Sequence, residues 1–218
     1  MLDVNAIRSQ FPILGEKVHG KPLVYLDNAA TTQKPLSVIE RIDAFYKKTN
    51  ANIHRGAHHL ANISTEYFEN TRELTRSFLH ARETAEIIFT SGTTDSINLV
   101  AQTWGRQNIG KGDEILLSML EHHSNIVPWQ MLAEEKGAVI KVIPIHDNGT
   151  WQNETLNTLI NERTKLVAVN HVSNALGTVN PIETLIAKAH AAGAKVLIDG
   201  AQSVTHMPIN VQALDCDF

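Results

Sequence analysis

The chain has 218 residues, of which 43% are hydrophobic and 19% charged, and its formal net charge is −4. That length suits one large domain, alone or with a small appendage. The chain has no cluster of basic residues, which excludes the electrostatic pattern of a nucleic-acid-binding protein. Its longest apolar runs are far shorter than the roughly 20 residues that span a bilayer, so no membrane partner is expected. The single cysteine, Cys216, and the polar N-terminus predict a reducing, cytoplasmic compartment.

Two helices are predicted in the first third of the chain, over residues 35–50 and 64–80. The segment between them, NANIHRGAHHL, is polar, contains Gly56 and has no clear period, so we expect a loop. Residues 1–20 are expected to pack away from the main sheet, as part of a smaller subdomain. Residues 21–218 are expected to form the large domain.

Short apolar, β-rich runs predict strands, and most of them are nearly continuous in apolar residues, as in strands covered on both faces. Apolar side chains at helical spacing lie between them, for example over residues 97–104 and 182–189. Strands that alternate with helices predict an α/β protein, a three-layer α/β/α fold with a mostly parallel sheet. Ligands of such folds bind beyond the carboxyl ends of the strands. The predicted strands are residues 23–27, 86–90, 114–118, 139–145, 165–170 and 195–199.

The segment TSGTTDSINLV, residues 90–100, runs from a predicted strand through a turn into an amphipathic helix. Gly92 allows close approach of the backbone, and Thr93 and Thr94 place hydroxyls beside the unpaired N–H groups of the helix start. This arrangement can bind a phosphate group without a basic side chain. It also suits an ordinary helix start capped by threonine.

The segment EHHSN, residues 121–125, follows the predicted strand EILLS. A histidine at this position can stack on an aromatic cofactor, transfer a proton or bind a metal. A hydrogen-bonded structural role is the alternative for any single histidine. No zinc-type spacing of cysteine and histidine occurs, so no metal site is predicted.

Two further polar groups follow predicted strands. Asp199 ends the apolar strand of KVLIDGAQS, where a poorly solvated carboxylate needs a partner such as a protonated ring nitrogen. Gln202 lies three residues later, and Asn174 lies in the turn of NHVSNALGT. Asp199 would equally cap the turn that follows it. Thr94, His122, Asn174 and Asp199 each follow a different strand, and this convergence favours one ligand site.

These segments, with YLDNAATTQKP and NIHRGAHHL upstream, resemble the pyridoxal-phosphate (PLP) dependent cysteine desulfurases. The likeness is strongest to the SufS/CsdA-type group II branch of the class V aminotransferase superfamily, whose fold is type I. It runs from about residue 7 to the end of the chain. The order and spacing of the motifs are more specific than any one motif.

The resemblance implies a PLP site and a role for each matching residue. Thr93 and Thr94 would bind the cofactor phosphate, and His122 would stack on the ring as a catalytic residue. Asp199 would be the second catalytic residue and would pair with the protonated ring nitrogen. Asn174 and Gln202 would address the phenolic oxygen or the substrate. The residues expected near the substrate entrance and the dimer interface are Ala29, Ala30, His54 and Arg55.

The resemblance also implies the reaction and its partners. Such enzymes convert L-cysteine to L-alanine and hold the sulfur as a persulfide for a sulfur-acceptor protein in iron–sulfur cluster assembly, and a homodimer is expected. The Schiff-base lysine, the persulfide cysteine and the substrate-clamping arginine of the family have no counterpart in these 218 residues. We therefore expect an incomplete PLP-binding domain, an N-terminal half that is inactive alone. Cys216 matches no nucleophile position and suits a small buried hydrophobic residue.

Three alternatives remain open. The parent enzyme could be a selenocysteine lyase that acts on L-selenocysteine, or another class V enzyme such as a kynureninase. HRG and EHHSN argue against the latter. The third alternative is a non-catalytic truncated chain.

Overall fold

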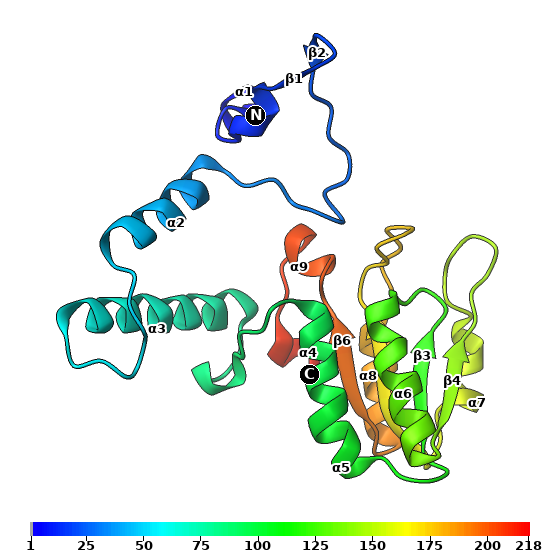
Figure 1. Cartoon of the computed structure of the whole chain (residues 1–218). Coiled ribbons are helices and arrows are strands. Elements are labelled where there is room, and N and C mark those ends of the chain that lie inside the picture. The colour runs from blue at the N-terminus through cyan, green and yellow to red at the C-terminus, as the bar shows by residue number, and fades with distance from the viewer. Residues whose placement is uncertain (1) are drawn as a thin grey trace. The chain divides into compact units, whose positions relative to one another are not determined.

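The computed structural model describes residues 2–218, and the chain divides into two compact units, residues 1–74 and 75–218 (Figure 1). The boundary expected after residue 20 stays a prediction. No helix among residues 2–218 is long and apolar enough to cross a membrane.

The first unit is built mainly from helices. Helix α1 (Val4–Arg8) begins at Asp3, whose Oδ1 accepts the Ala6 N–H at 3.0 Å. The short antiparallel strands β1 (Lys17–Val18) and β2 (Lys21–Pro22) follow a 3-10 turn at Pro12–Gly15.

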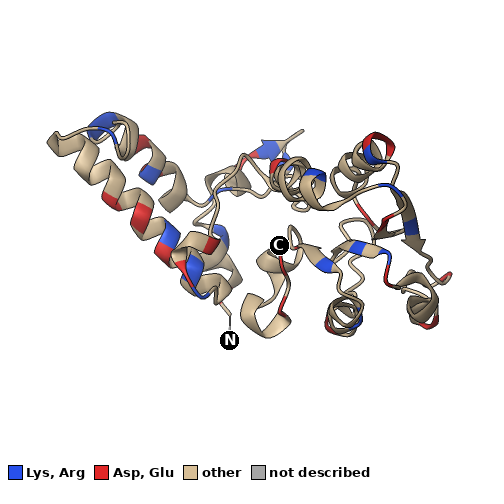
Figure 2. Ribbon diagram, turned by 90° about the horizontal axis from the view of Figure 1, so that it is seen from below, with Lys and Arg blue, Asp and Glu red and all other residues tan. Residues whose placement is uncertain are grey.

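The two longest helices are α2 (Leu36–Lys48) and α3 (His59–Leu79), which continues into the second unit. The Arg41 guanidinium lies 4.0 Å from the centre of the Tyr67 ring, so the two helices pack together through a cation–π contact. Lys, Arg, Asp and Glu residues are interspersed along the helices rather than gathered by sign (Figure 2).

The second unit contains a four-stranded sheet in the order β4-β3-β5-β6, with every neighbouring pair parallel. The strands are β3 (Glu114–Ser118), β4 (Val139–Ile143), β5 (Thr164–Asn170) and β6 (Lys195–Asp199). The backbone of Phe218 exchanges hydrogen bonds with Val196 and Ile198, so the last residues lie along the free edge of β6.

Alternate strand residues enter two separate cores. Ile115 and Leu117 of β3 pack with Trp129 of α6 (Val127–Lys136), whereas Leu116 packs with Leu185 of α8 (Ile182–Ala191). Helices therefore cover both faces of the sheet, and the predicted α/β/α fold is confirmed (Figure 1). The first face also holds α4 (Thr93–Val100), a wider helical turn (Ala101–Gly105) and α5 (Arg106–Asn108), and the second holds α7 (Leu156–Leu159). The shorter helices are Thr84–Glu86, His123–Asn125, Asn153–Thr155, α9 (Ser203–His206) and α10 (Val211–Leu214).

Two of the predicted strands are wrong. Residues 23–27 form no strand of either sheet, and in the predicted strand 86–90 residue 86 ends a 3-10 turn while residues 87–90 form no strand. Val24 and Leu26 are 76% and 90% exposed, which is the opposite of a strand covered on both faces. A β-rich composition supports a strand only where a neighbouring strand completes the hydrogen-bonded ladder. The second predicted helix also begins earlier, at His59 rather than at residue 64.

Candidate functional site

Several segments meet at one edge of the second unit. The strands of the sheet are parallel, so their carboxyl ends share an edge, and the N-terminus of α4 lies at that same edge (Figure 1). His122, Asn174 and Asp199 follow or end strands β3, β5 and β6, and Thr94 lies in the first turn of α4. We call this edge of the sheet, where the four strands end and α4 begins, the carboxyl edge.

The start of α4 has no side-chain cap. Gly92 precedes the helix with φ +148°, a conformation that suits glycine, and Thr93 and Thr94 follow it with Thr94 exposed. The Asp95 carboxylate accepts the Ser91 N–H at 3.0 Å and so occupies one donor of the turn. The first-turn N–H groups of the helix have no partner four residues earlier and can bind an anion.

His122 lies four residues beyond β3 at the start of the short helix His123–Asn125. Its Nδ1 accepts the Ser124 N–H at 3.2 Å and lies 2.8 Å from Ser124 Oγ. The ring is exposed, and the His123 ring centre is 6.0 Å away, edge-on. Because Nδ1 is an acceptor, a neutral His122 ring carries its proton on Nε2.

Asp199 is the last residue of β6 and is only 7% exposed. Among residues 2–218, the one hydrogen bond to its carboxylate comes from the Ala201 N–H, at 2.9 Å to Oδ1, so Oδ2 remains available. Its backbone carbonyl accepts the His171 N–H, which ties the end of β6 to the end of β5.

Asn174 and Gln202 lie in the loops after β5 and β6. Asn174 is exposed in a turn that Ser173 Oγ stabilises by accepting the N–H groups of Ala175 and Leu176. Gln202 is half-buried and immediately precedes α9. Both belong to the second unit.

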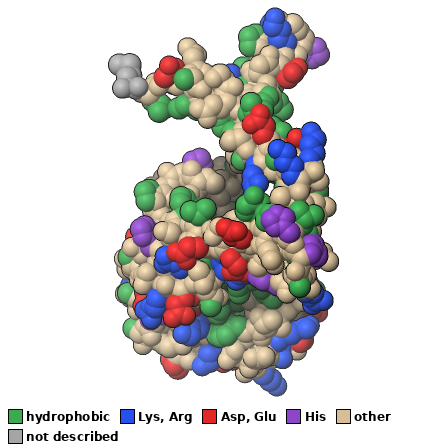
Figure 3. Space-filling model, turned by 90° about the vertical axis from the view of Figure 1, so that its left-hand side faces the viewer, with side chains coloured by type: hydrophobic (Ala, Val, Ile, Leu, Met, Phe, Trp, Pro, Cys, Tyr) green, Lys and Arg blue, Asp and Glu red, His purple; other side chains and the backbone are tan. Residues whose placement is uncertain are grey.

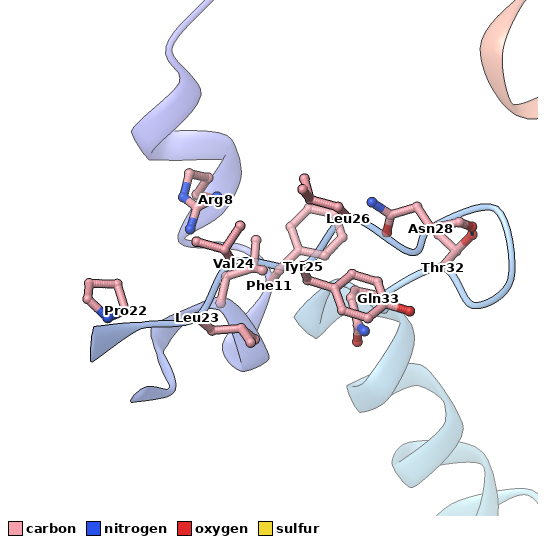
Figure 4. A pocket seen from close by; sticks show the side chains of 11 residues that line it. Arg8, Phe11, Pro22, Leu23, Val24, Tyr25, Leu26, Asn28, Thr32 and Gln33 are labelled. Carbon is pink, nitrogen blue, oxygen red and sulfur yellow. Dashed lines mark hydrogen bonds between the residues drawn. The ribbon is translucent and has the colours of Figure 1, made fainter. Parts of the chain in front are cut away.

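The four predicted substrate residues belong to the first unit. Ala29 and Ala30 lie in an exposed turn in which the Asp27 carbonyl accepts the Ala30 N–H. A cavity of about 490 Å³ is lined by residues that precede and follow this turn in the chain. Phe11, Leu23 and Tyr25 are among its lining residues (Figure 4). Further hydrophobic side chains reach the surface of the molecule (Figure 3).

His54 is held within its own unit, and Arg55 beside it is exposed. The His54 backbone has φ +59°, and its N–H donates to Thr65 Oγ1 at 3.0 Å. The His54 Nε2 lies 3.1 Å from Glu69 Oε1. The Phe68 ring meets the His54 ring edge-on at 5.7 Å.

The motif analysis gave no role to Glu121. This residue is 9% exposed and accepts hydrogen bonds from Ser118 Oγ, Asn125 Nδ2 and the Asn170 N–H. Burial, and to a smaller extent the negative charge of Asp199, raise the pKa of Glu121 to about 7 against the opposing hydrogen bonds. Its place beside His122 after a strand was the one available signal.

Comparison with known proteins identifies the family. The aminotransferase class-V profile matches residues 24–218. A cysteine desulfurase from Salmonella newport is 54% identical over 215 residues, and a probable cysteine desulfurase from Halalkalibacterium halodurans is 51% identical over 217 residues. These matches cover 99% and 100% of the chain but 53% of each relative, so the chain spans about half the length of these relatives.

Solved structures agree in fold. The cysteine desulfurase CsdA from Escherichia coli matches the whole chain with a TM-score of 0.87 and 37% identity, over 53% of its own length. A mutant of the protein C-DES, solved with glycine covalently linked to its PLP cofactor, matches 96% of the chain and 53% of its own, with a TM-score of 0.80 and 25% identity. With its three-layer fold and its family match over residues 24–218, the chain belongs to the aminotransferase class-V family, whose PLP-dependent members include the cysteine desulfurases that it resembles.

Proposed function

We propose that these 218 residues supply the N-terminal, cofactor-binding half of a cysteine desulfurase. The parent enzyme converts L-cysteine to L-alanine and transfers sulfur to an enzyme cysteine as persulfide, in the reducing cytoplasm, for iron–sulfur cluster assembly. The observation that carries the proposal is the buried Asp199 carboxylate at the edge where α4 begins. The 54% identity to a cysteine desulfurase supports the choice of reaction.

The donor set at the carboxyl edge fits PLP. An uncapped start of α4 with Gly92 before it suits the phosphate, and a buried carboxylate with one open oxygen suits a protonated ring nitrogen. The exposed, flat ring of His122 suits stacking on the pyridine ring. Asp95 stands against this in part, because its carboxylate lies in the same turn as the phosphate position.

In the mechanism we propose, PLP supplies an electron sink for the charge that develops at the substrate α-carbon. Asp199 stabilises the protonated ring nitrogen, and the first-turn N–H groups of α4 with Thr93 and Thr94 orient the phosphate. His122 holds the ring by stacking, and the proton on its Nε2 is available for transfer. Asn174 and Gln202 donate hydrogen bonds to the phenolic oxygen or to the substrate.

The first-unit residues and the partners complete the proposal. Ala29, Ala30, His54 and Arg55 face the substrate entrance in a homodimer, and a separate acceptor protein receives the sulfur. The Salmonella relative supports L-cysteine as substrate, with L-selenocysteine as the alternative.

The test is a chimera in which residues 1–218 continue into the C-terminal half of the Salmonella relative. With L-cysteine, it is expected to release alanine and, with a thiol reductant, sulfide. Asp199→Ala should lower the rate at least a hundredfold and weaken PLP binding. The matched control is Asp217→Asn, because the Asp217 carboxylate pairs with Lys195 away from the carboxyl edge. A folded, PLP-loaded chimera with no activity, or one unaffected by Asp199→Ala, would refute the proposal.

A further inference from the structure

Glu121 joins three segments of the carboxyl edge through its carboxyl group. Ser118 Oγ at the end of β3 donates at 2.5 Å to Oε1, and the Asn170 N–H at the end of β5 donates to the same oxygen at 3.0 Å. Asn125 lies in the short helix after His122, and its Nδ2 donates to Glu121 Oε2 at 2.7 Å. The residue next to His122 is therefore anchored to two strands.

The partners of Glu121 are themselves fixed. Asn125 Oδ1 accepts the fully buried Trp129 Nε1–H at 2.9 Å, which sets the orientation of the Asn125 amide. Asn170 donates to the Leu120 carbonyl, and Asn180 donates to the Asn170 side chain. Asn170 is also the register partner of Asp199. A continuous chain of contacts thus runs from the His122 loop to Asp199.

Among the described residues, no basic side chain donates a hydrogen bond to the Glu121 carboxyl group. The donors to its carboxyl are a hydroxyl, an amide and a backbone N–H, and the titratable neighbours along the packed segments are His122 and His123 on its own segment, His171 after β5 and Asp199 on β6. Burial lowers the pKa of His171 and so favours its neutral form. Burial disfavours an unpaired carboxylate, and a second negative charge beside Asp199 disfavours it further.

We propose that Glu121 is a positioning residue of the carboxyl edge, whose buried carboxyl group anchors the His122 loop to β5. Glu121 takes up or releases one proton and keeps its hydrogen bond with Ser118 Oγ in both states. When ionised, Glu121 accepts from the Ser118 hydroxyl, and when protonated it donates to the same oxygen. Ionisation adds negative charge next to Asp199, so the electrostatics of the edge change with pH. The role of this edge in holding PLP rests on the proposed function, whereas the anchor and its proton do not.

The first experiment follows the proton in the full chain without cofactor. The Trp129 indole N–H resonance is the reporter, because Asn125 connects it to Glu121, and Trp104 and Trp151 are internal controls. We expect the Trp129 signal to titrate with a midpoint near 7 in the unsubstituted chain, as the raised pKa of Glu121 requires. Glu121→Gln should abolish this transition, and Glu114→Gln should retain it. Glu114 is the control, since its side chain is also buried and it lies at the other end of β3.

The second experiment measures PLP binding by fluorescence in the same variants. Glu121→Ala should weaken binding at least tenfold relative to the unsubstituted chain, while Glu114→Gln changes it less than threefold. A Trp129 transition that survives in Glu121→Gln, or equal PLP affinity in Glu121→Ala and Glu114→Gln, would overturn the inference. Failure of the unsubstituted chain and of the chimera to bind PLP would instead refute the proposed function, because the Trp129 titration needs no cofactor.

Discussion

Asn170 and Asp199 face each other as register partners at the ends of β5 and β6. Glu121 accepts the Asn170 N–H, and the negative charge of Asp199 contributes to its raised pKa. The charge of Asp199 therefore adds to the effect of burial on Glu121, although the two residues lie 78 positions apart in the chain. That pairing predicts how the edge responds to pH and to substitution.

The unfolding free energy should fall as pH rises from about 4.5 to about 7, as far as Glu121 contributes. Its pKa is raised in the folded chain from 4.5 to about 7, so the native state binds the extra proton in this window and loses it above. The contribution is on the order of 3 kcal/mol. Urea unfolding at several pH values would measure it as the difference between the unsubstituted chain and Glu121→Gln. Equal pH slopes in those two proteins would contradict it.

Ser118→Ala should move the Trp129 titration to higher pH. The hydrogen bond from Ser118 lowers the pKa of Glu121, so its loss leaves the effect of burial less opposed. Ser124→Ala is the control, because Ser124 contacts His122 and is not among the hydrogen-bond donors of Glu121. A shift to lower pH, or the same shift in both variants, would show that Ser118 does not share the proton.

Gly92→Ala should weaken both stability and anion binding. The backbone there has φ +148°, where an added Cβ is strained although it meets no atom within 4 Å. Strain of this kind costs about 1–3 kcal/mol. Gly15→Ala is the control, since Gly15 has no positive φ and equal space. Thermal unfolding and competition of inorganic phosphate with PLP would measure the two effects. Unchanged phosphate competition in Gly92→Ala would count against a phosphate site at α4.

The 218-residue chain alone should form no stoichiometric lysine adduct with PLP after borohydride treatment, and it should release no sulfide from L-cysteine. Lys195, the last lysine, begins β6 and pairs with Asp217 at 2.7 Å. Four residues at about 3.3 Å each put it about 13 Å from Asp199. Mass spectrometry of the reduced sample would detect an adduct, and one at a single lysine would show that the catalytic group lies within these residues.

Glu114→Gln should destabilise the chain by about 1–3 kcal/mol, without affecting the carboxyl edge. Burial alone would raise the pKa of Glu114, but hydrogen bonds from Lys141 and Asn161 and the charge of Arg163 lower it overall. The carboxylate is therefore ionised and paired at neutral pH, at 2.8 Å from both cations. Denaturant unfolding at pH 7 would measure the loss, and no loss would indicate that the two ion pairs contribute no net stability.

Local patterns were sufficient for the sheet where the neighbours are also present. EILLS and KLVAVN form adjacent strands because each supplies the ladder of the other. LVYLD has the same composition but no strand beside it in either sheet, and composition cannot reveal a missing neighbour. The position of the predicted site residues at one edge of the sheet could be predicted because every parallel strand ends on the same side, and their roles stay predictions. Glu121 was not, since its burial depends on Asn170, 49 residues later.

Strand β3 carries a buried glutamate at its first residue and leads to another three residues after its last. Glu114 is bound by two cations, whereas the hydrogen-bond donors to Glu121 among the described residues are all neutral. A change in acidity within the neutral range therefore reaches one end of this strand and leaves the other unaltered. The end of the strand at Glu114 keeps its ion pairs in this range, while the carboxyl edge at Glu121 can change its charge with pH.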